Sequence, residues 1–479
     1  MKNTRNSKSK NDSTPLQVFA TWSEDAIAGR RLDVKYWIPA IRELQKAIQH
    51  GKYESQKLGD FITDIRYGIS TTNEYVDSGV PLLRILNLKN DGLDLSKIVY
   101  LPESRSDEIG KAVVHENDLL ISRSGSVGIV IVVPKEVEGF AFGSFMIKFC
   151  LNDKINKQYV AAWLNGEASR KLIEREKIGA IQGNITIETI KNFDIPIPPI
   201  SIQNEVVKKI QKAYEQRQRK KAEVENVLFS IDDFVFGELG IDIPKESPER
   251  VFQIWSDEIQ TRLDPSYFRP IFKMLDKIFS TTKYNVKTLK NLSTKITSGS
   301  TPLSGGDAYT NQNDGIPFLR SGDINPDNEI DFDNLNFIKK EIHNKKLKSS
   351  QLEKGDLLIA LIGATIGQVS VYNMDREANI SQNLASVRLK DDVYPEYAKE
   401  FLLSKFGQME LDRIKRYAAR ANINLDEVGS LQVIYPSKDK QNEMVGKIRK
   451  IRAKATELRQ EAESIVISAQ KQVEQMILA

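Results

Sequence analysis

The chain has 479 residues, 40% of them hydrophobic, a size and composition that predict a folded, soluble protein with two or three domains. Its 69 lysines and arginines nearly balance 65 acidic residues, and the net charge of +4 is too small to indicate nucleic-acid binding by itself. The single cysteine, Cys150, excludes an internal disulfide, and three scattered histidines argue against a metal site. No apolar run reaches about 18 residues. We therefore expect a cytoplasmic protein without a membrane partner.

The first 13 residues are polar and basic and contain no apolar stretch, which predicts a disordered arm at 1–13 rather than a signal peptide. Residues 14–200 follow as a first mixed domain. Short β-rich runs between Gly, Asn, Ser and Asp clusters predict its strands, and apolar periodicity predicts its helices. The predicted strands are at 80–88, 118–122, 128–133 and 145–151, and the predicted helices are at 36–50 and 158–176.

The first domain is predicted to end in a stiff strut at Ile195–Ile200, because proline fixes φ and restricts the residue before it. The strut enters a long helix at 201–236. A linker with glycines and prolines at 237–250 allows the chain to turn back. A second mixed domain at 251–437 and a second long helix at 438–479 complete the predicted order.

The second half of the chain repeats the first. Residues 14–25 are TPLQVFATWSED and residues 247–258 are SPERVFQIWSDE, and the Asp-Leu-Leu-Ile sequence at 118–121 recurs at 356–359 (356 − 118 = 238). A period this long exceeds the roughly 20–50 residues of solenoid units. Each repeat is therefore predicted to be a domain-sized unit.

Both long helices carry apolar residues at alternating steps of four and three, the period of a coiled-coil seam. The first seam is apolar at both ends and basic in the middle. We predict that the two helices pair with each other in antiparallel orientation; the alternative is that each packs on its own domain. The principal positions are Ile210, Arg217, Lys220, Val224, Ile231, Ile448, Ile451, Leu458 and Ile465.

Each long helix also has a basic stretch, at 207–221 in the first and at 447–459 in the second. A solvated helix face is the simpler interpretation of such a stretch. The equivalent places of the two stretches favour a polyanion or an acidic partner as the alternative.

Motifs for catalysis are absent from the sequence: it has no Walker loop, Rossmann fingerprint, His-Glu-x-x-His, paired cysteines or Asn/Asp-Pro-Pro-Tyr/Phe. Two Gly-spaced segments, Ser122–Gly128 and Leu361–Gly367, lack a phosphate-binding lysine and are predicted to be hairpin turns, with close approach to a nucleic acid as the alternative. Trp22 and Trp255, each preceded by Val-Phe, are predicted core anchors, with a nucleic-acid platform as the alternative.

The order of these motifs resembles the specificity subunit (HsdS) of type I restriction-modification enzymes. Each unit has Trp-Ser-Glu/Asp, Arg-Leu-Asp, Asp-Leu-Leu-Ile before a Gly-rich turn, and an Asn-Ile, Pro, Gln-x-Glu run into a long helix, and the match covers residues 15–479. The resemblance implies an α+β fold with two tandem target recognition domains, each reading one half of a bipartite DNA target. It also implies that the two spacer helices form an antiparallel coiled coil that docks two methyltransferase subunits.

The resemblance further implies that this chain is not an enzyme. S-adenosylmethionine, ATP and Mg would belong to partner modification and restriction subunits, and this chain would hold no cofactor. Two alternatives stay open: a specificity module of another methyltransferase-dependent defence system, and a non-enzymatic coiled-coil scaffold that does not bind DNA.

Base contacts are expected from polar side chains in loops at strand ends, because Arg, Asn, Gln, Ser and Thr reach base edges in the major groove. A turn or capping role is the alternative for each residue. The candidates in the first domain are Ser70, Thr71, Thr72, Arg84, Asn87, Ser122, Arg123, Ser124, Gln182 and Asn184. The candidates in the second domain are Ser300, Thr301, Arg320, Ser321, Gln382, Asn383, Arg416, Arg420 and Asn422.

Two domains that read different half-sites should differ where they touch bases. Arg123 against Ile362 and Gln182 against Arg420 are therefore better base-reading candidates than the shared asparagines, Asn184 and Asn422.

Overall fold

The computed structural model describes residues 34–70, 75–177, 183–242, 251–256, 259, 262–303, 306–417 and 421–479. The predicted arm at 1–13 lies outside the described residues. The chain forms two compact units: Met1–Lys221 with Gln460–Ala479, and Ala222–Arg459. No helix in the described part of the chain combines the length and apolar character that a membrane crossing needs.

The first unit is a mixture of short strands and helices. Its helices are α2 (Pro39–Gln49), α3 (Ser106–Ile109), α4 (Lys157–Leu164), α5 (Glu167–Glu176) and α6 (Ile187–Lys191). Its strands are β1 (Ser55–Lys57), β2 (Ile62–Tyr67), β3 (Val80–Leu83), β4 (Leu88–Lys89), β5 (Gly92–Leu93), β6 (Val99–Leu101), β7 (Leu119–Ser122), β8 (Val130–Val132), β9 (Ala141–Phe142), β10 (Met146–Leu151) and β11 (Asp194–Pro196). They form the sheets β2-β10-β7-β8, β6-β3-β9, β4-β5 and β1-β11.

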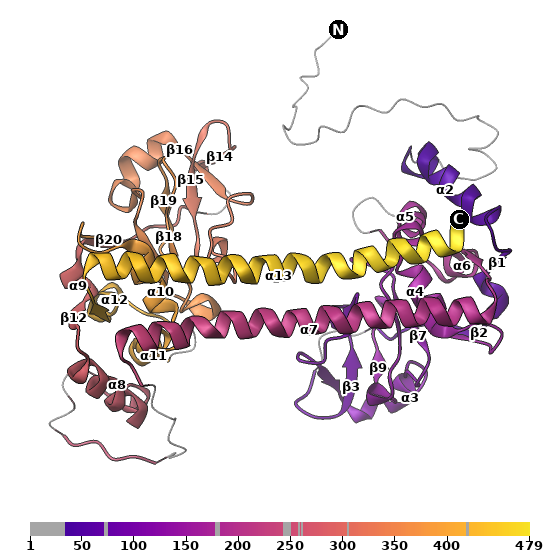
Figure 1. Ribbon diagram of the computed structural model, residues 1–479, viewed down its shortest axis with the longest axis horizontal. Helices are drawn as coiled ribbons and strands as arrows, with labels where there is room; N and C mark the ends of the chain where they lie inside the picture. Colours follow the sequence, from indigo (N-terminus) through magenta and orange to yellow (C-terminus); the bar gives the residue numbers. More distant parts are fainter. Residues whose placement is uncertain are drawn as a thin grey trace, which may run out of the picture. The chain divides into compact units, whose positions relative to one another are not determined.

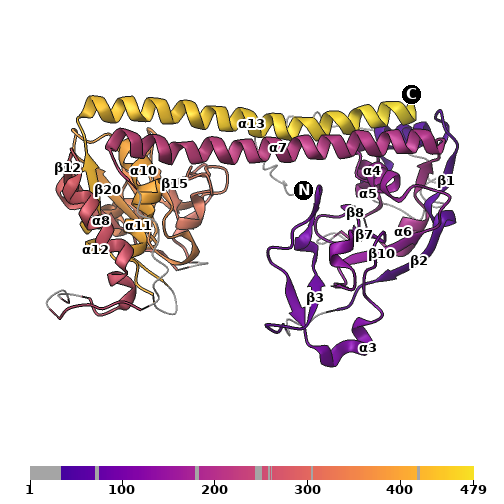
Figure 2. The ribbon, with the colours of Figure 1, turned by 60° about the horizontal axis from the view of Figure 1, so that its bottom comes forward.

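Strand β7, which contains most of the Asp-Leu-Leu-Ile motif, is buried on both faces of its sheet. Successive side chains of a strand point to opposite faces. Leu119 and Ile121 accordingly pack in the core that includes α4 and the long helix α7 (Ile200–Leu239), whereas Leu120 packs in a second core with β3 and β9. Figure 2 shows α4 and α5 between this sheet and α7. The motif therefore marks the central strand of the unit.

The second unit repeats this architecture. Its helices are α8 (Pro270–Thr281), α9 (Leu289–Leu292), α10 (Pro395–Leu403), α11 (Lys405–Ile414) and α12 (Leu425–Ser430). Its strands are β12 (Asn285–Thr288), β13 (Ser293–Ser298), β14 (Tyr309–Thr310), β15 (Gly315–Leu319), β16 (Asn336–Lys339), β17 (Leu357–Ala360), β18 (Val369–Val371), β19 (Asn379–Ile380), β20 (Leu384–Leu389) and β21 (Gln432–Tyr435). The sheet β13-β20-β17-β18 matches β2-β10-β7-β8, and β12-β21 matches β1-β11. The predicted α+β fold with two tandem units is confirmed.

Local structure follows the predicted pattern with several differences. The run predicted as one strand at 80–88 is strand β3, the 3-10 turn Ile85–Asn87 and strand β4. The stretch predicted as one helix at 158–176 is two helices, because Asn165 bonds to the backbone of Val130 and Gly166 starts α5. The strut is strand β11, which pairs with β1. Helix α7 runs through Gly237, assigned above to the linker, and ends before Gly240, whose φ of +66° favours glycine. Both Gly-spaced segments are hairpin turns, as predicted, between β7 and β8 and between β17 and β18.

The two long helices, α7 and α13 (Lys438–Leu478), pair within each unit (Figure 1). In the first unit Lys209 Nζ donates to Gln472 Oε1 (3.0 Å), and Lys220 Nζ lies 2.9 Å from Glu461 Oε2. In the second unit Lys447 Nζ donates to Glu238 Oε1 (3.1 Å). Residue numbers rise along α7 as they fall along α13. The predicted antiparallel pairing is thus confirmed.

The apolar positions of the predicted seam are largely buried inside the chain, whereas its basic positions Arg217 and Lys220 pair with Asp91 and Glu461. Val224 packs with Ala455 and Leu458 in a cluster that contains only the two long helices. Towards the ends of the helices, the seam also enters the domain cores. The residues that do so are Ile210 and, partly buried, Ile465 in the first unit, and Ile231, Ile448 and, partly buried, Ile451 in the second. Helix pairing and packing on the domain therefore occur together.

Trp255 is 70% exposed, so the prediction that it anchors the core is wrong. Its segment, residues 251–256, forms no strand or helix that could pack the indole against a core. Arg262 of the following Arg-Leu-Asp motif is instead fixed, by Asp264 (2.8 Å) and by stacking on Tyr267. Trp22 lies outside the described residues.

Helix α11 carries a buried carboxyl group, Glu410, which is 3% exposed. Its Oε1 lies 3.6 Å from Arg413 Nη1, too far for a hydrogen bond. Burial raises the pKa of Glu410 to about 7, although the charge of Arg413 acts in the opposite direction.

We expect the contribution of Glu410 to the stability of the chain to fall as pH rises from about 4.5 to above 7. The unfolded chain releases this proton near the ordinary pKa of 4.5, whereas the folded chain holds it to about 7, so this contribution is full below about pH 4.5 and is lost as pH rises through about 7. Glu410→Gln should remove this dependence. Thermal unfolding at pH 5 and pH 8 checks it: the Tm of the variant should gain on the wild type as pH rises, and equal differences at both pH values would contradict the assignment.

Candidate functional site

Several loops of the first unit meet at one end of its sheets. Four of these loops follow β2, β3, β7 and β9, and a fifth loop precedes α6. Backbone hydrogen bonds join them: Ile69 N to Phe142 O (3.0 Å), Gly143 N to Leu83 O (3.0 Å), Arg123 N to Phe145 O (2.9 Å) and Ile185 N to Arg123 O (3.1 Å). The structure thus brings the segments around Ser70, Arg84, Arg123 and Asn184 together.

The second unit joins its loops in the same way. The bonds are Gly299 N to Ser381 O (3.3 Å), Ser381 N to Leu319 O (2.8 Å), Leu361 N to Asn383 O (3.0 Å) and Ile423 N to Leu361 O (3.0 Å). The segments around Ser300, Arg320, Gln382 and Asn422 are therefore neighbours. Each unit has one loop cluster, at the same place in its fold.

Glycine permits the close approach of these loops. A Cβ at Gly68 would lie 2.3 Å from Phe142 O, and a Cβ at Gly299 would lie 1.6 Å from Ile380 O. No side chain fits at such distances. The Gly-Ile-Ser and Gly-Ser-Thr segments after β2 and β13 are therefore pinned to the neighbouring loop by backbone contact.

Arg123 stacks on Tyr67, with 4.6 Å between the guanidinium carbon and the ring centroid. The backbone bonds place Leu361, not Ile362, at the equivalent position of the second unit. Arg123 N donates to Phe145 O in the first unit, and Leu361 N donates to Asn383 O in the second. The comparison of Arg123 with Ile362 made from the sequence is therefore one residue out of register. The buried Leu361 gives the two clusters different chemistry at this point.

Some candidates of the first unit hold their own loops. Ser122 Oγ donates to Ser126 O (2.5 Å) and accepts from Ile129 N (2.8 Å). The buried amide of Asn87 accepts from Arg84 N (2.8 Å) and donates to Asp94 O (2.7 Å). Arg84 Nη2 donates to Lys97 O (2.9 Å). These contacts hold Arg84, Asn87 and Ser122 within their own loops, although the buried Arg84 Nε has no hydrogen-bond partner among the described residues.

The second unit has similar internal contacts. Arg320 Nη2 lies 2.9 Å from Asp323 Oδ1, and Arg416 Nε donates to Glu427 Oε1 (2.6 Å). Ser321 and Asn383 are half-buried. Ser300, Thr301 and Gln382 are exposed at the loop cluster. Thr71, Thr72, Gln182 and Arg420 lie outside the described residues. All these residues stay predictions as DNA contacts.

An apolar groove of about 450 Å³, missed by the sequence analysis, opens in the first cluster. Leu86 and Phe145 line it and are 67% and 52% exposed. Sequence analysis placed Phe145 at the start of a strand, where an apolar residue normally belongs to the core. Its position after the Gly143-Ser144 turn was the available signal for another role.

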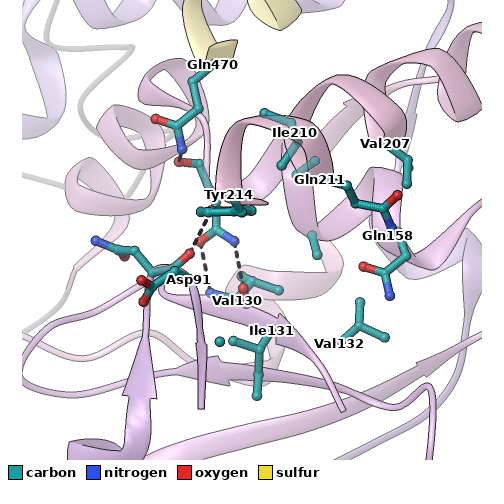
Figure 3. Close-up of a pocket in the computed structure, with 15 residues that line it drawn as sticks. Asp91, Val130, Ile131, Val132, Gln158, Val207, Ile210, Gln211, Tyr214 and Gln470 are labelled. Atoms are coloured by element: carbon teal, nitrogen blue, oxygen red, sulfur yellow. Dashed lines mark hydrogen bonds between the residues drawn. The ribbon is translucent and has the colours of Figure 1, made fainter. Parts of the chain in front are cut away.

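An acidic turn ties each loop cluster to a long helix. In the first unit Asp91 Oδ2 lies 2.7 Å from Arg217 Nη1 and 3.0 Å from Lys221 Nζ, and Tyr214 Oη donates to Asn90 O (2.7 Å). Figure 3 shows Asp91 and Tyr214 at a cavity of about 180 Å³ where α7 packs on the domain. Burial by itself raises the pKa of Asp91. The hydrogen bond from Lys221 and the charges of Arg217 and Lys221 outweigh it and hold the pKa below its ordinary value, so the carboxylate is charged.

The turn recurs in the second unit, where Asp327 Oδ1 lies 2.9 Å from Arg459 Nη1. Arg459 is the counterpart of Lys221 (459 − 221 = 238). Other cations of the two basic stretches also pair within their unit, namely Lys220 with Glu461 and Arg452 with Glu400. Several cations of both stretches therefore form ion pairs within their unit, a role that neither the solvated-face interpretation nor the partner alternative had included. In the described ranges, no group of three or more His, Cys, Asp or Glu side chains could hold a metal ion.

Comparisons with known proteins agree with the duplicated architecture. A family model described as the type I restriction modification DNA specificity domain matches residues 51–226 and 282–467. The chain is 24% identical over 381 residues to the type I restriction enzyme EcoBI specificity subunit of Escherichia coli, covering 79% of this chain and 74% of the relative. It is 22% identical over 393 residues to the EcoKI specificity subunit of Escherichia coli strain K12, covering 80% and 77%.

A solved structure from a study of complex assembly and conformational transition of the type I R-M system has the same fold. The TM-score is 0.51 at 15% sequence identity, and the match covers 89% of this chain and 96% of the other. At this identity the likeness concerns the fold alone.

Proposed function

Because this chain belongs to the type I restriction modification DNA specificity domain family and contains that domain twice, we propose that it is the non-catalytic DNA-recognition subunit of a type I restriction-modification complex. Each unit reads one half of a bipartite target. The observation that carries the proposal is the pair of equivalent loop clusters, one per unit, which share three of the four backbone contacts given above and differ in their side chains. Two such clusters suit a target with two unlike halves.

Sequence readout needs side chains that reach base edges, and affinity needs cations on phosphates. The polar candidates of the two clusters supply the first function. Arg123 is the strongest in the first unit, because its stacked guanidinium is a planar fork that suits guanine. Gln382 and Asn383 are the strongest in the second unit, because an amide can bind adenine at two points.

The partners that we propose are those that the family resemblance implies. Two methyltransferase subunits dock on the paired helices and bind S-adenosylmethionine, and restriction subunits bind ATP and Mg. The chain itself holds no cofactor and works in the cytoplasm. Exposed apolar side chains on the long helices, Phe229 and Ile467, support an external partner there, since the seam is already buried within the chain.

The test is methylation sequencing of single DNA molecules from cells that express this chain together with its methyltransferase subunit. New methyladenine in a split motif is the expected result. Cells with the methyltransferase subunit alone are the control and should lack that methylation. If the two proteins form a complex and the methyltransferase subunit is active, but no motif appears, the scaffold alternative would replace this proposal.

A further inference from the structure

The groove of the first unit exposes apolar side chains at the loop cluster. Leu86 belongs to the short 3-10 turn Ile85–Asn87, and Phe145 precedes β10. Neither has a capping or core role that would explain an apolar residue there, since 67% and 52% of their surfaces are exposed. Gly125, with φ +71°, also lines the groove and has no side chain to fill it. A Cβ at this position would lie 3.7 Å from Ile85 Cδ1.

Ser124 lines the same groove. Its side chain is buried, and its Oγ has no hydrogen-bond partner among the residues that the structure describes. A buried hydroxyl without a partner is unusual, because desolvation without a compensating bond costs free energy. The groove therefore combines an unsatisfied hydroxyl with two apolar side chains, and Arg123 lies next to the hydroxyl in the chain.

We propose that this groove reads the major-groove edge of a thymine, with Leu86 and Phe145 against the 5-methyl group and the Ser124 hydroxyl donating to O4 after its side chain rotates toward the groove. Thymine is the base whose major-groove edge places a methyl group beside an acceptor. Cytosine offers a donor at the equivalent place and no methyl group. The inference rests on the proposed function, and it assigns a base to one position of the half-site read by the first unit.

The second unit differs at all three positions. Gly322 takes the place of Leu86, since both are the second residue after the matching arginines, Arg320 and Arg84. Asn383 replaces Phe145, because both accept from the equivalent backbone N–H. Ile362 replaces Ser124, because each bridges to the matching asparagine, Asn422 or Asn184. The second cluster thus has neither the apolar pair nor the hydroxyl.

The experiment uses the full chain in complex with its methyltransferase subunits, on duplexes that carry the motif found by methylation sequencing. Each thymine of the motif is replaced in turn by uracil, which lacks only the 5-methyl group. At one thymine, the methylation rate at subsaturating DNA should fall about 4-fold, the ratio expected for losing one buried methyl-sized contact.

The double variant L86A/F145A should lower the rate on the thymine duplex and respond to uracil at that position by less than about 1.5-fold. Leu95→Ala is the matched control: Leu95 is also an exposed leucine of the first unit but does not line the groove, so the uracil penalty should persist. Equal Tm values for the three proteins establish that both variants fold.

Two results would overturn the inference: uracil tolerated at every thymine, or a uracil penalty of unchanged size in L86A/F145A. Both arise only after the wild-type chain has directed methylation to a motif. A chain that directs none fails at that earlier step, which would remove the proposed function and the thymine assignment together.

Discussion

Asp356→Ala should lower the free energy of unfolding by about 3 kcal/mol. The Asp356 side chain is 1% exposed and accepts from Arg388 Nε and Nη2, each at 2.9 Å, and from Glu353 N, also at 2.9 Å. Removing the carboxylate leaves Arg388 Nε and Nη2 and the backbone N–H of Glu353 without this acceptor, whereas Arg388 Nη1 keeps its pair with Glu353 Oε1. We expect the lower end of the range for broken buried pairs, because Arg388 remains partly in contact with water. Urea unfolding of both proteins measures the difference.

Asp375→Ala is the control for this prediction. Asp375 also pairs with a cation, Lys354 (2.8 Å), but both side chains are mostly exposed. Exposed pairs contribute up to about 1 kcal/mol. Equal losses of unfolding free energy in the two variants would show that the burial of Asp356 does not increase its contribution to stability.

The first unit has the same aspartate with another cation. Asp118 Oδ2 accepts from His115 N (2.8 Å) and lies 3.0 Å from Lys148 Nζ, and Cys150 Sγ donates to Asp118 Oδ1 (2.9 Å). Arg388 occupies the position of Cys150 (388 − 150 = 238). Burial, together with this hydrogen bond, raises the pKa of Cys150 to about 12, so the thiol stays protonated. The sequence repeat identifies the aspartate, whereas its cation comes from a different position of the neighbouring strand in each unit.

Features with a local period could be predicted from the sequence. The heptad spacing of the long helices, the proline strut and three of the four β-rich runs of the first domain all describe residues that are close in the chain. The duplication then predicted a second unit of the same kind, without strand bounds of its own. The break at Gly166 escaped prediction, because it depends on Asn165 bonding to Val130, a residue 35 positions away.

The roles of the loop residues depended on contacts that no local pattern shows. Asn87 and Ser122 are polar residues at strand ends, as base-contacting residues would be, yet both bond inside their own loops. Leu86 and Phe145 are apolar but exposed, because the loops meet at backbone atoms and leave the groove open. Register also mattered: only the backbone bonds place Leu361 opposite Arg123.

Arg123→Ala should reduce methylation of the wild-type target by about 5- to 150-fold and relax the motif at one base pair of one half-site. The stack on Tyr67 holds the guanidinium plane, so the fork is ordered before DNA binds. A fork that binds guanine at O6 and N7 makes its contribution at that base pair alone. Methylation rates on the target and on duplexes changed at each position in turn give the measurement.

Arg123→Lys separates base reading from phosphate binding. Lysine keeps the charge but cannot reproduce the planar fork, so the variant should lose most of the discrimination if Arg123 reads guanine. If Arg123 instead contacts a phosphate, lysine should restore the rate, and alanine should weaken all duplexes equally and lower the salt dependence. Arg66→Ala is the matched control, since Arg66 lies exposed on strand β2 of the same sheet and pairs with Asp64 (2.7 Å). The DNA motif methylated with the Arg66→Ala variant should not change. The first cluster keeps Arg123, and the second cluster, including Leu361, is untouched.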